Sequence, residues 1–264
     1  MLADSHIHLF ENGYQDSGKN TLETYLPLIH EFSISRALVI GYEGKPWALG
    51  NNAYIANLKK SNSWISPVAF VKVSDLSREN LESLVGQGFV GISLYVFTNK
   101  DVGILQGIDD GIWQWLVDNK WLISVNSKGD LWLLWMEVLK RNPTLTLLIS
   151  HIGLIAIPTK RASEVEIATA LTTISSLMNF SNVYLKLSGF YALEPSDPVD
   201  AYRLLAPYIR YVVEKFSVDK LIWGSDFPLS LDKVSFVQTF ENLNYIEPLK
   251  LKNILEGNLQ RLLR

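Results

Sequence analysis

Short apolar runs alternate with amphipathic stretches along the whole chain. The runs are rich in β-branched and aromatic residues, which favour strands. In the stretches between them, apolar residues recur every three or four positions, the spacing of a helix with one buried face. We expect strands at residues 2–10, 34–42, 64–73, 89–97, 122–128, 145–153, 182–190 and 220–228. We expect helices at residues 21–32, 51–61, 77–87, 109–119, 129–142, 164–179, 200–216 and 230–243, and a closing helix at 251–263.

Regular alternation of strand and helix predicts the α/β class, because parallel strands need helical crossovers. Eight such units predict a (β/α)8 TIM barrel with an extra C-terminal helix. No linker rich in Gly, Ser or Pro interrupts the pattern, so we expect one domain over residues 1–264. A doubly wound open sheet is the alternative, but the turn LFENGYQDSG after the first strand lacks the glycine pattern common in that fold.

Composition narrows the class of protein. Hydrophobic residues make up 48% and charged residues 19% of 264 residues, an ordinary globular balance. The net charge of −3, without a basic cluster, argues against nucleic acid as a partner. The chain has no cysteine, which excludes disulfides and thiolate metal sites. No apolar run reaches the roughly 20 residues of a membrane helix, and no signal peptide is visible. We therefore expect a cytoplasmic protein that does not bind membranes.

Chemically useful side chains fall at the carboxyl ends of the expected strands, where barrel active sites lie. Three of the four histidines, His6, His8 and His151, are among them, and Asp226 ends the eighth strand. The period of two in a strand places His6 and His8 on the same face. The fourth histidine, His30, falls near the end of the first helix and is expected to be a surface residue.

Each of these residues alone has a structural explanation. His151 could be a hydrogen-bonded core histidine, and Asp226 in GSDFP could cap the next helix. Together, at matching strand ends, they favour a functional site, because burying imidazoles and a carboxylate costs too much desolvation without a partner or purpose.

These motifs resemble the amidohydrolase superfamily, in particular the amidohydrolase-2 branch that includes 2-pyrone-4,6-dicarboxylate lactonase and sugar-lactone hydrolases. The resemblance covers nearly the whole chain. It rests on the segments HIH (6–8), GFVGISL (88–94), SHIG (150–153), NVYLKLSGFY (182–191) and DKLIWGSDFPL (219–229). It implies a TIM-barrel hydrolase that opens a lactone with an activated water.

The resemblance also implies roles for the site residues. Asp226 would be the general base, and His151 would bind the carbonyl oxygen or assist proton transfer. His6 and His8 would act either as hydrogen-bond donors or, with Asp226, as ligands of one divalent metal, zinc or manganese. Metal-dependent and metal-free catalysis remain equal alternatives at this point.

Two departures from the family pattern bear on the metal and the substrate. Most metal-dependent members have a histidine at the end of the fifth strand, where this chain has Asn126. The dicarboxylate lactonase uses arginines at two places where this chain has Ser93 and the pair Phe190 and Tyr191. We therefore expect a neutral or singly charged lactone from a sugar acid rather than a dicarboxylate.

The remaining expectations concern binding and rival functions. The residues expected to bind substrate are Lys186, Asn126, Ser93 and Tyr191. The expected partner is a small-molecule substrate, and a homo-oligomer is left open. The rival functions are a metal-dependent decarboxylase or amide hydrolase of the same superfamily, and a non-catalytic barrel that binds a small molecule.

Overall fold

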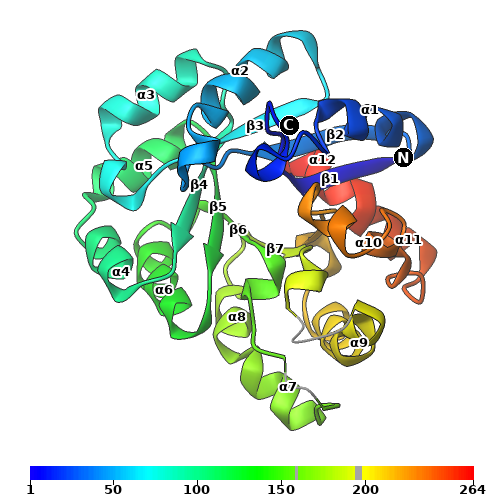
Figure 1. The fold of residues 1–264 in the computed structure, drawn as a ribbon. Coiled ribbons are helices and arrows are strands. Elements are labelled where there is room, and N and C mark those ends of the chain that lie inside the picture. Colours follow the sequence, from blue (N-terminus) through cyan, green and yellow to red (C-terminus); the bar gives the residue numbers. More distant parts are fainter. Residues whose placement is uncertain (158–159, 194–197) are drawn as a thin grey trace.

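Eight parallel strands form one sheet in which every strand pairs with its neighbours in the sequence, in the order β1 to β8. The computed structural model describes residues 1–157, 160–193 and 198–264, with the backbone alone at 198–203. The strands are β1 (Leu2–Ile7), β2 (Ile34–Ile40), β3 (Ile65–Phe70), β4 (Gly91–Val96), β5 (Leu122–Ser127), β6 (Thr146–Ile149), β7 (Val183–Leu187) and β8 (Leu221–Trp223). Helices surround the strands (Figure 1), and the predicted (β/α)8 barrel is confirmed.

The helices lie between and after the strands: α1 (Leu22–Glu31), α2 (Asn51–Ser61), α3 (Arg78–Gly86), α4 (Asn99–Gln106), α5 (Asp110–Asp118), α6 (Leu133–Arg141), α7 (Glu164–Ala170), α8 (Thr172–Leu177), α9 (Pro198–Lys215), α10 (Gln238–Glu241), α11 (Pro248–Lys252) and α12 (Asn258–Leu262). Each expected helical range contains helix. The sequence did not predict α4, and the expected helix at 230–243 is mostly replaced by a short 3-10 turn and the four-residue α10.

The observed strands are shorter than expected at their carboxyl ends. His151 lies in a 3-10 turn (His151–Gly153) after β6, and Asp226 lies three residues beyond the end of β8. Both residues are therefore in loops rather than in strands. Barrel active sites are built in such loops, because the loop backbone is free to aim side chains inward.

The barrel is closed between β1 and β8 by a few contacts instead of a regular ladder. Ile7 and Phe227 form an isolated parallel bridge. Around it, the Asp226 N–H donates to the His6 carbonyl over 2.8 Å, and the His8 N–H donates to the Phe227 carbonyl over 2.7 Å. This seam brings the His-x-His segment beside the loop that carries Asp226.

A β-bulge in β1 changes which side chains face the barrel interior. Between Asp4 and Ile7 the strand advances three residues while its partner β2 advances two. Ala3 therefore packs in the cluster inside the barrel, whereas Ile7 packs in the cluster between strands and helices. His6 and His8 share the inward face, as the period of two predicted.

Two apolar clusters stabilise the fold. The larger one fills the space between the strands and the surrounding helices and contains the fully buried Trp113 and Trp135. The smaller one lies inside the barrel and includes Leu38, Leu148 and Ile222. Each fully buried side chain of this size contributes about 1.5–3 kcal/mol.

The extra C-terminal helix is confirmed. A π-helical turn (Asn253–Gly257) joins α11 to α12, and this segment packs against β1 and β8 (Figure 1). Leu259 of α12 joins the cluster inside the barrel. The C-terminal segment thus supports the same seam that the site residues share.

Within the described part of the chain, no helix combines the length and apolar character needed to cross a membrane.

Candidate active site

A pocket of about 240 Å³ opens at the carboxyl ends of the strands. Among the expected site residues, His8, Asn126, His151, Tyr191 and Asp226 line it. The other lining residues are Phe10, Tyr14, Tyr42, Tyr95, Ala192 and Leu229. Its mixed lining of aromatic and polar side chains is that of a small-molecule site.

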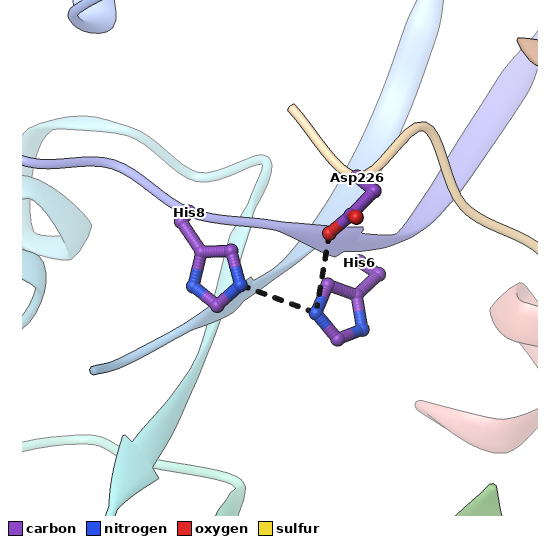
Figure 2. A group of neighbouring side chains, drawn as sticks. All are labelled: His6, His8 and Asp226. Atoms are coloured by element: carbon purple, nitrogen blue, oxygen red, sulfur yellow. Dashed lines mark hydrogen bonds and ion pairs between the residues drawn. The ribbon is translucent and has the colours of Figure 1, made fainter. Parts of the chain in front are cut away.

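His6, His8 and Asp226 lie beside one another at this site, and His8 and Asp226 line the pocket (Figure 2). The Nε2 atoms of His6 and His8 lie 3.3 Å apart, and His6 Nε2 lies 3.6 Å from Asp226 Oδ1. All three side chains are buried. Residues 220 positions apart in the sequence therefore meet because the barrel closes at the seam between β1 and β8.

Asp226 and His151 are both held in an uncommon backbone conformation. Asp226 has φ of +59° and His151 has φ of +53°, the left-handed region. His151 also lies directly on the backbone of Gly189, where an added Cβ would clash with the imidazole Nδ1. Such strain is found where the surrounding structure fixes a functional side chain.

Hydrogen bonds orient two of the imidazoles. His8 Nδ1 donates to the Ile40 carbonyl over 2.7 Å, which leaves the lone pair of His8 on Nε2. His151 Nδ1 lies 3.0 Å from the Ser188 hydroxyl. If that hydroxyl donates, the proton of the neutral ring is on Nε2.

Burial controls the charge of the site. It raises the pKa of Asp226 from 3.8 to about 6, against the lowering effects of His8, Tyr191 and Lys186. It lowers the pKa of His6 well below its usual value, and with the Lys186 charge it lowers that of His151 to about 3. At neutral pH the imidazoles are therefore uncharged and Asp226 is a carboxylate with raised basicity. The contact between His6 and Asp226 is then not an ion pair.

Lys186 lies beneath the histidines instead of in the pocket wall. It is fully buried, and its Nζ contacts His6 Nδ1 at 3.2 Å and donates to the Ser124 hydroxyl over 2.8 Å. Burial lowers its pKa to about 7. Through these contacts Lys186 supports His6, and it is not among the residues that line the pocket, where the sequence analysis expected it to bind substrate.

Ser93, also expected to bind substrate, is likewise outside the pocket lining. It is fully buried inside the barrel, and its hydroxyl has no hydrogen-bond partner among the described residues. Asn126 and Tyr191, the other two expected substrate-binding residues, do line the pocket.

The donor set fits one divalent metal ion. The ligand atoms of His6, His8 and Asp226 all lie within 4.8 Å of one another. For His6 to bind a metal through Nε2, the proton of its ring must be on Nδ1. That proton would be donated to the neutral amine of Lys186. The neutral amine is present at neutral pH, because burial lowers the pKa of Lys186 to about 7. Two neutral imidazoles and a carboxylate suit zinc or manganese with positions left for water and substrate.

Aromatic residues of the pocket were missed by the sequence analysis. Tyr42 and Tyr95 pack against each other with ring centroids 5.3 Å apart, and Phe10 stacks parallel to His8 at 5.9 Å. Phe10 follows the end of β1 by three residues, and Tyr42 follows the end of β2 by two. This position just after a strand was the sequence signal that could have identified them as pocket residues. Tyr191 was expected to bind substrate, and it also donates a hydrogen bond of 2.6 Å to Asp226 Oδ2.

A basic carboxylate beside donor groups, at the mouth of a (β/α)8 barrel, is suited to activating a water molecule. Barrel hydrolases work in this way. The chain belongs to the amidohydrolase family, whose sequence model matches residues 3–264. The resemblance seen in the motifs is thereby confirmed.

A curated relative is L-fucono-1,5-lactonase of Burkholderia ambifaria, which is 35% identical over 91 residues. The match spans 34% of this chain and 29% of that protein, so it covers less than a third of the lactonase's length.

Solved structures share the fold over the full length. An amidohydrolase from Burkholderia multivorans with bound zinc has a TM-score of 0.80 at 15% identity, with 99% of this chain and 98% of that chain covered. A probable 2-pyrone-4,6-dicarboxylic acid hydrolase from Acinetobacter baumannii has a TM-score of 0.76 at 18% identity, with the same coverage. At this identity the two structures support the fold alone.

Proposed function

We propose that the protein hydrolyses a lactone of a small sugar acid, with Asp226 as the general base. The observation that carries the proposal is the geometry of Asp226, a buried carboxylate that lines the pocket with Oδ2 held by Tyr191 and Oδ1 facing His6; burial raises its pKa to about 6. A base with this pKa is deprotonated at neutral pH and is strong enough to take a proton from water. Family membership and the partial match to a lactonase support the same chemistry.

The reaction follows from the positions of the side chains. Asp226 removes a proton from a water molecule as the water oxygen bonds to the lactone carbonyl carbon. The carbonyl oxygen becomes an oxyanion, for which His151 and Asn126 offer hydrogen-bond donors. When the ring C–O bond breaks, protonated Asp226 returns its proton to the leaving alkoxide. The product is the open hydroxy acid.

A metal ion would be held by His6, His8 and Asp226. When bound, it would supply a Lewis acid that polarises water or the carbonyl. The zinc in the Burkholderia multivorans protein favours zinc as the ion for this site. Without a metal, the same histidines remain polar groups that orient the water.

The pocket favours an uncharged substrate. Among its described lining residues there is no lysine or arginine, and Tyr14, Tyr42, Tyr95 and Tyr191 contribute aromatic faces and hydroxyls. A dicarboxylate would need cationic partners there. Tyrosines instead suit the C–H faces and hydroxyls of a sugar ring.

We further propose a cytoplasmic enzyme whose partner is this small molecule. The lack of cysteine is compatible with a cytoplasmic location. The net charge of −3 favours a small molecule over nucleic acid as the partner.

The test is a screen of 1,5- and 1,4-aldonolactones with a pH indicator, with metal-loaded and chelator-treated protein, and with Asp226→Asn as the background control. Turnover of neutral lactones above that control is the expected result. Release of carbon dioxide from acid substrates without lactone turnover would favour a decarboxylase. Ligand binding without turnover of any substrate would favour a non-catalytic barrel.

A further inference from the structure

Asp4 is a fully buried carboxylate that lies outside the pocket and is not used by the proposed reaction. Its Oδ1 accepts hydrogen bonds from two backbone N–H groups, that of His6 over 3.2 Å and that of Ser225 over 2.9 Å. Its Oδ2 accepts a hydrogen bond of 3.1 Å from the hydroxyl of Tyr25 on α1. One oxygen atom therefore joins the two segments that carry His6 and Asp226.

The bulge in β1 explains why a side chain is needed at this place. The bulge interrupts the regular pairing of β1 with β2 directly after Asp4, whose side chain contacts Tyr25 on α1. β1 and β8 share only the isolated bridge at Ile7 and Phe227. At this interrupted pairing Oδ1 accepts from two buried N–H groups, which would be costly to leave without a partner.

The two N–H groups belong to residues that determine the geometry of the site. One is that of His6 itself, and the other is that of Ser225, the residue before Asp226. The Asp226 N–H in turn donates to the His6 carbonyl over 2.8 Å. These bonds join the two segments at the seam across which His6 Nε2 and Asp226 Oδ1 lie 3.6 Å apart.

We propose that Asp4 is a positioning residue that sets the placement of His6 relative to Asp226 by holding the seam between β1 and β8. The kinetic part of this inference rests on the proposed lactone hydrolysis, whereas the geometric part does not. Asp4 acts on the site through the backbone N–H groups of His6 and Ser225 and through a hydrogen bond with the Ser225 side chain, without touching the pocket.

Three variants separate positioning from simple stabilisation. Asp4→Ala removes the acceptor for both N–H groups. Asp4→Asn keeps an amide oxygen as acceptor and offers its NH2 to the Tyr25 oxygen. Tyr25→Phe is the matched control, since it removes one hydrogen bond from the same carboxylate on the side away from the site and retains the ring.

With the lactone substrate, Asp4→Ala is expected to lower kcat about 100-fold, the effect of a displacement near 1 Å at a reacting group, with KM little changed. Asp4→Asn is expected to restore most of kcat. Tyr25→Phe is expected to lower the melting temperature and to keep kcat. If Asp4→Ala and Tyr25→Phe lower the melting temperature alike and both keep kcat, Asp4 only stabilises the fold and the proposal is wrong.

A second measurement needs no substrate. The chain has four histidines, so their imidazole signals are resolvable by NMR after histidine labelling. Asp4→Ala, or Asp4→Ser if the alanine variant does not fold, is expected to shift the His6 and His8 signals and to leave the exposed His30 unchanged. The same signals should stay in place in Tyr25→Phe. Unchanged His6 signals in the Asp4 variant would refute the positioning role, even if the protein proves to have another activity.

Discussion

The hydroxyl of Tyr191 donates a 2.6 Å hydrogen bond to Oδ2 of Asp226, leaving Oδ1 of the same carboxylate facing His6. Tyr191 lies in the 3-10 turn (Phe190–Ala192) after β7, and Asp226 lies in the loop after β8. The two carboxylate oxygens therefore have different environments. One is fixed by the phenol, and the other is directed to the imidazoles, where a proton can be exchanged.

Replacing Asp226 with Asn should remove the base and keep the shape of the side chain. We expect kcat on the lactone substrate to fall by about 10²- to 10⁴-fold, the contribution of a positioned general base. The melting temperature should stay close to that of the unaltered protein, because the amide oxygen can still accept from Tyr191. Steady-state kinetics and circular dichroism measure the two quantities, and near-full activity of a folded variant would contradict the assignment.

The pH dependence of kcat/KM should have an acid limb set by Asp226. Only the carboxylate form accepts a proton, so activity should decline as the pH falls below about 6, the pKa of this group. The hydrogen bond from Tyr191 stabilises the carboxylate and lowers that pKa. Tyr191→Phe should therefore move the limb to higher pH.

Tyr42→Phe is the control for this pH profile, because Tyr42 lines the same pocket and makes no contact with Asp226 in the described structure. The limb should keep its position in that variant. An equal displacement in both variants would show that the hydroxyl of Tyr191 has no specific effect on the carboxylate.

Gly189→Ala should displace His151 in addition to straining the backbone. Gly189 has φ of +62°, and an added Cβ would clash with the His151 ring. Gly88 is a matched control, with φ of +85° and open space around the added Cβ. Both variants should lose about 1–2 kcal/mol of stability from the left-handed backbone, measured by chemical unfolding. Only Gly189→Ala should lose activity at a temperature where it is folded, and equal activity losses would argue against a role for His151.

Zinc binding should depend on His8 and not on His151. His8 presents the Nε2 lone pair within the cluster of three donors, whereas His151 is outside that set. We expect one zinc per chain after dialysis of the unaltered protein and of His151→Ala, and a clear loss in His8→Ala. Elemental analysis and titration calorimetry measure it. A loss of zinc in His151→Ala as large as that in His8→Ala would show that the ligand set is wrong.

Much of the fold could be predicted from the sequence, because the signals are local. The alternation of apolar residues predicted each strand and the (β/α)8 order, since strand and helix periods are properties of short segments. The same order placed His8, His151 and Asp226 at one end of the barrel, because the carboxyl ends of parallel strands meet there. The short helix α4 was missed, since its eight residues carry only a weak apolar pattern.

Other features depended on contacts between distant segments. The sequence alone gave no reason to place Lys186 below His6, because the depth of a side chain inside a barrel depends on the register of β7 against its neighbours. The bulge in β1 and the bond from Asp4 to the Ser225 N–H arise from closing the sheet across 221 positions.

By itself, therefore, the sequence determined the barrel, its family and the set of ionisable groups at its mouth, through periodicity and strand order. Only the tertiary structure decided which of these groups touch, which are buried and which carry a proton. The pKa values of Asp226 and His151 depend on desolvation and on neighbours from other strands. One of them, His8, approaches Asp226 only when β1 and β8 close the barrel.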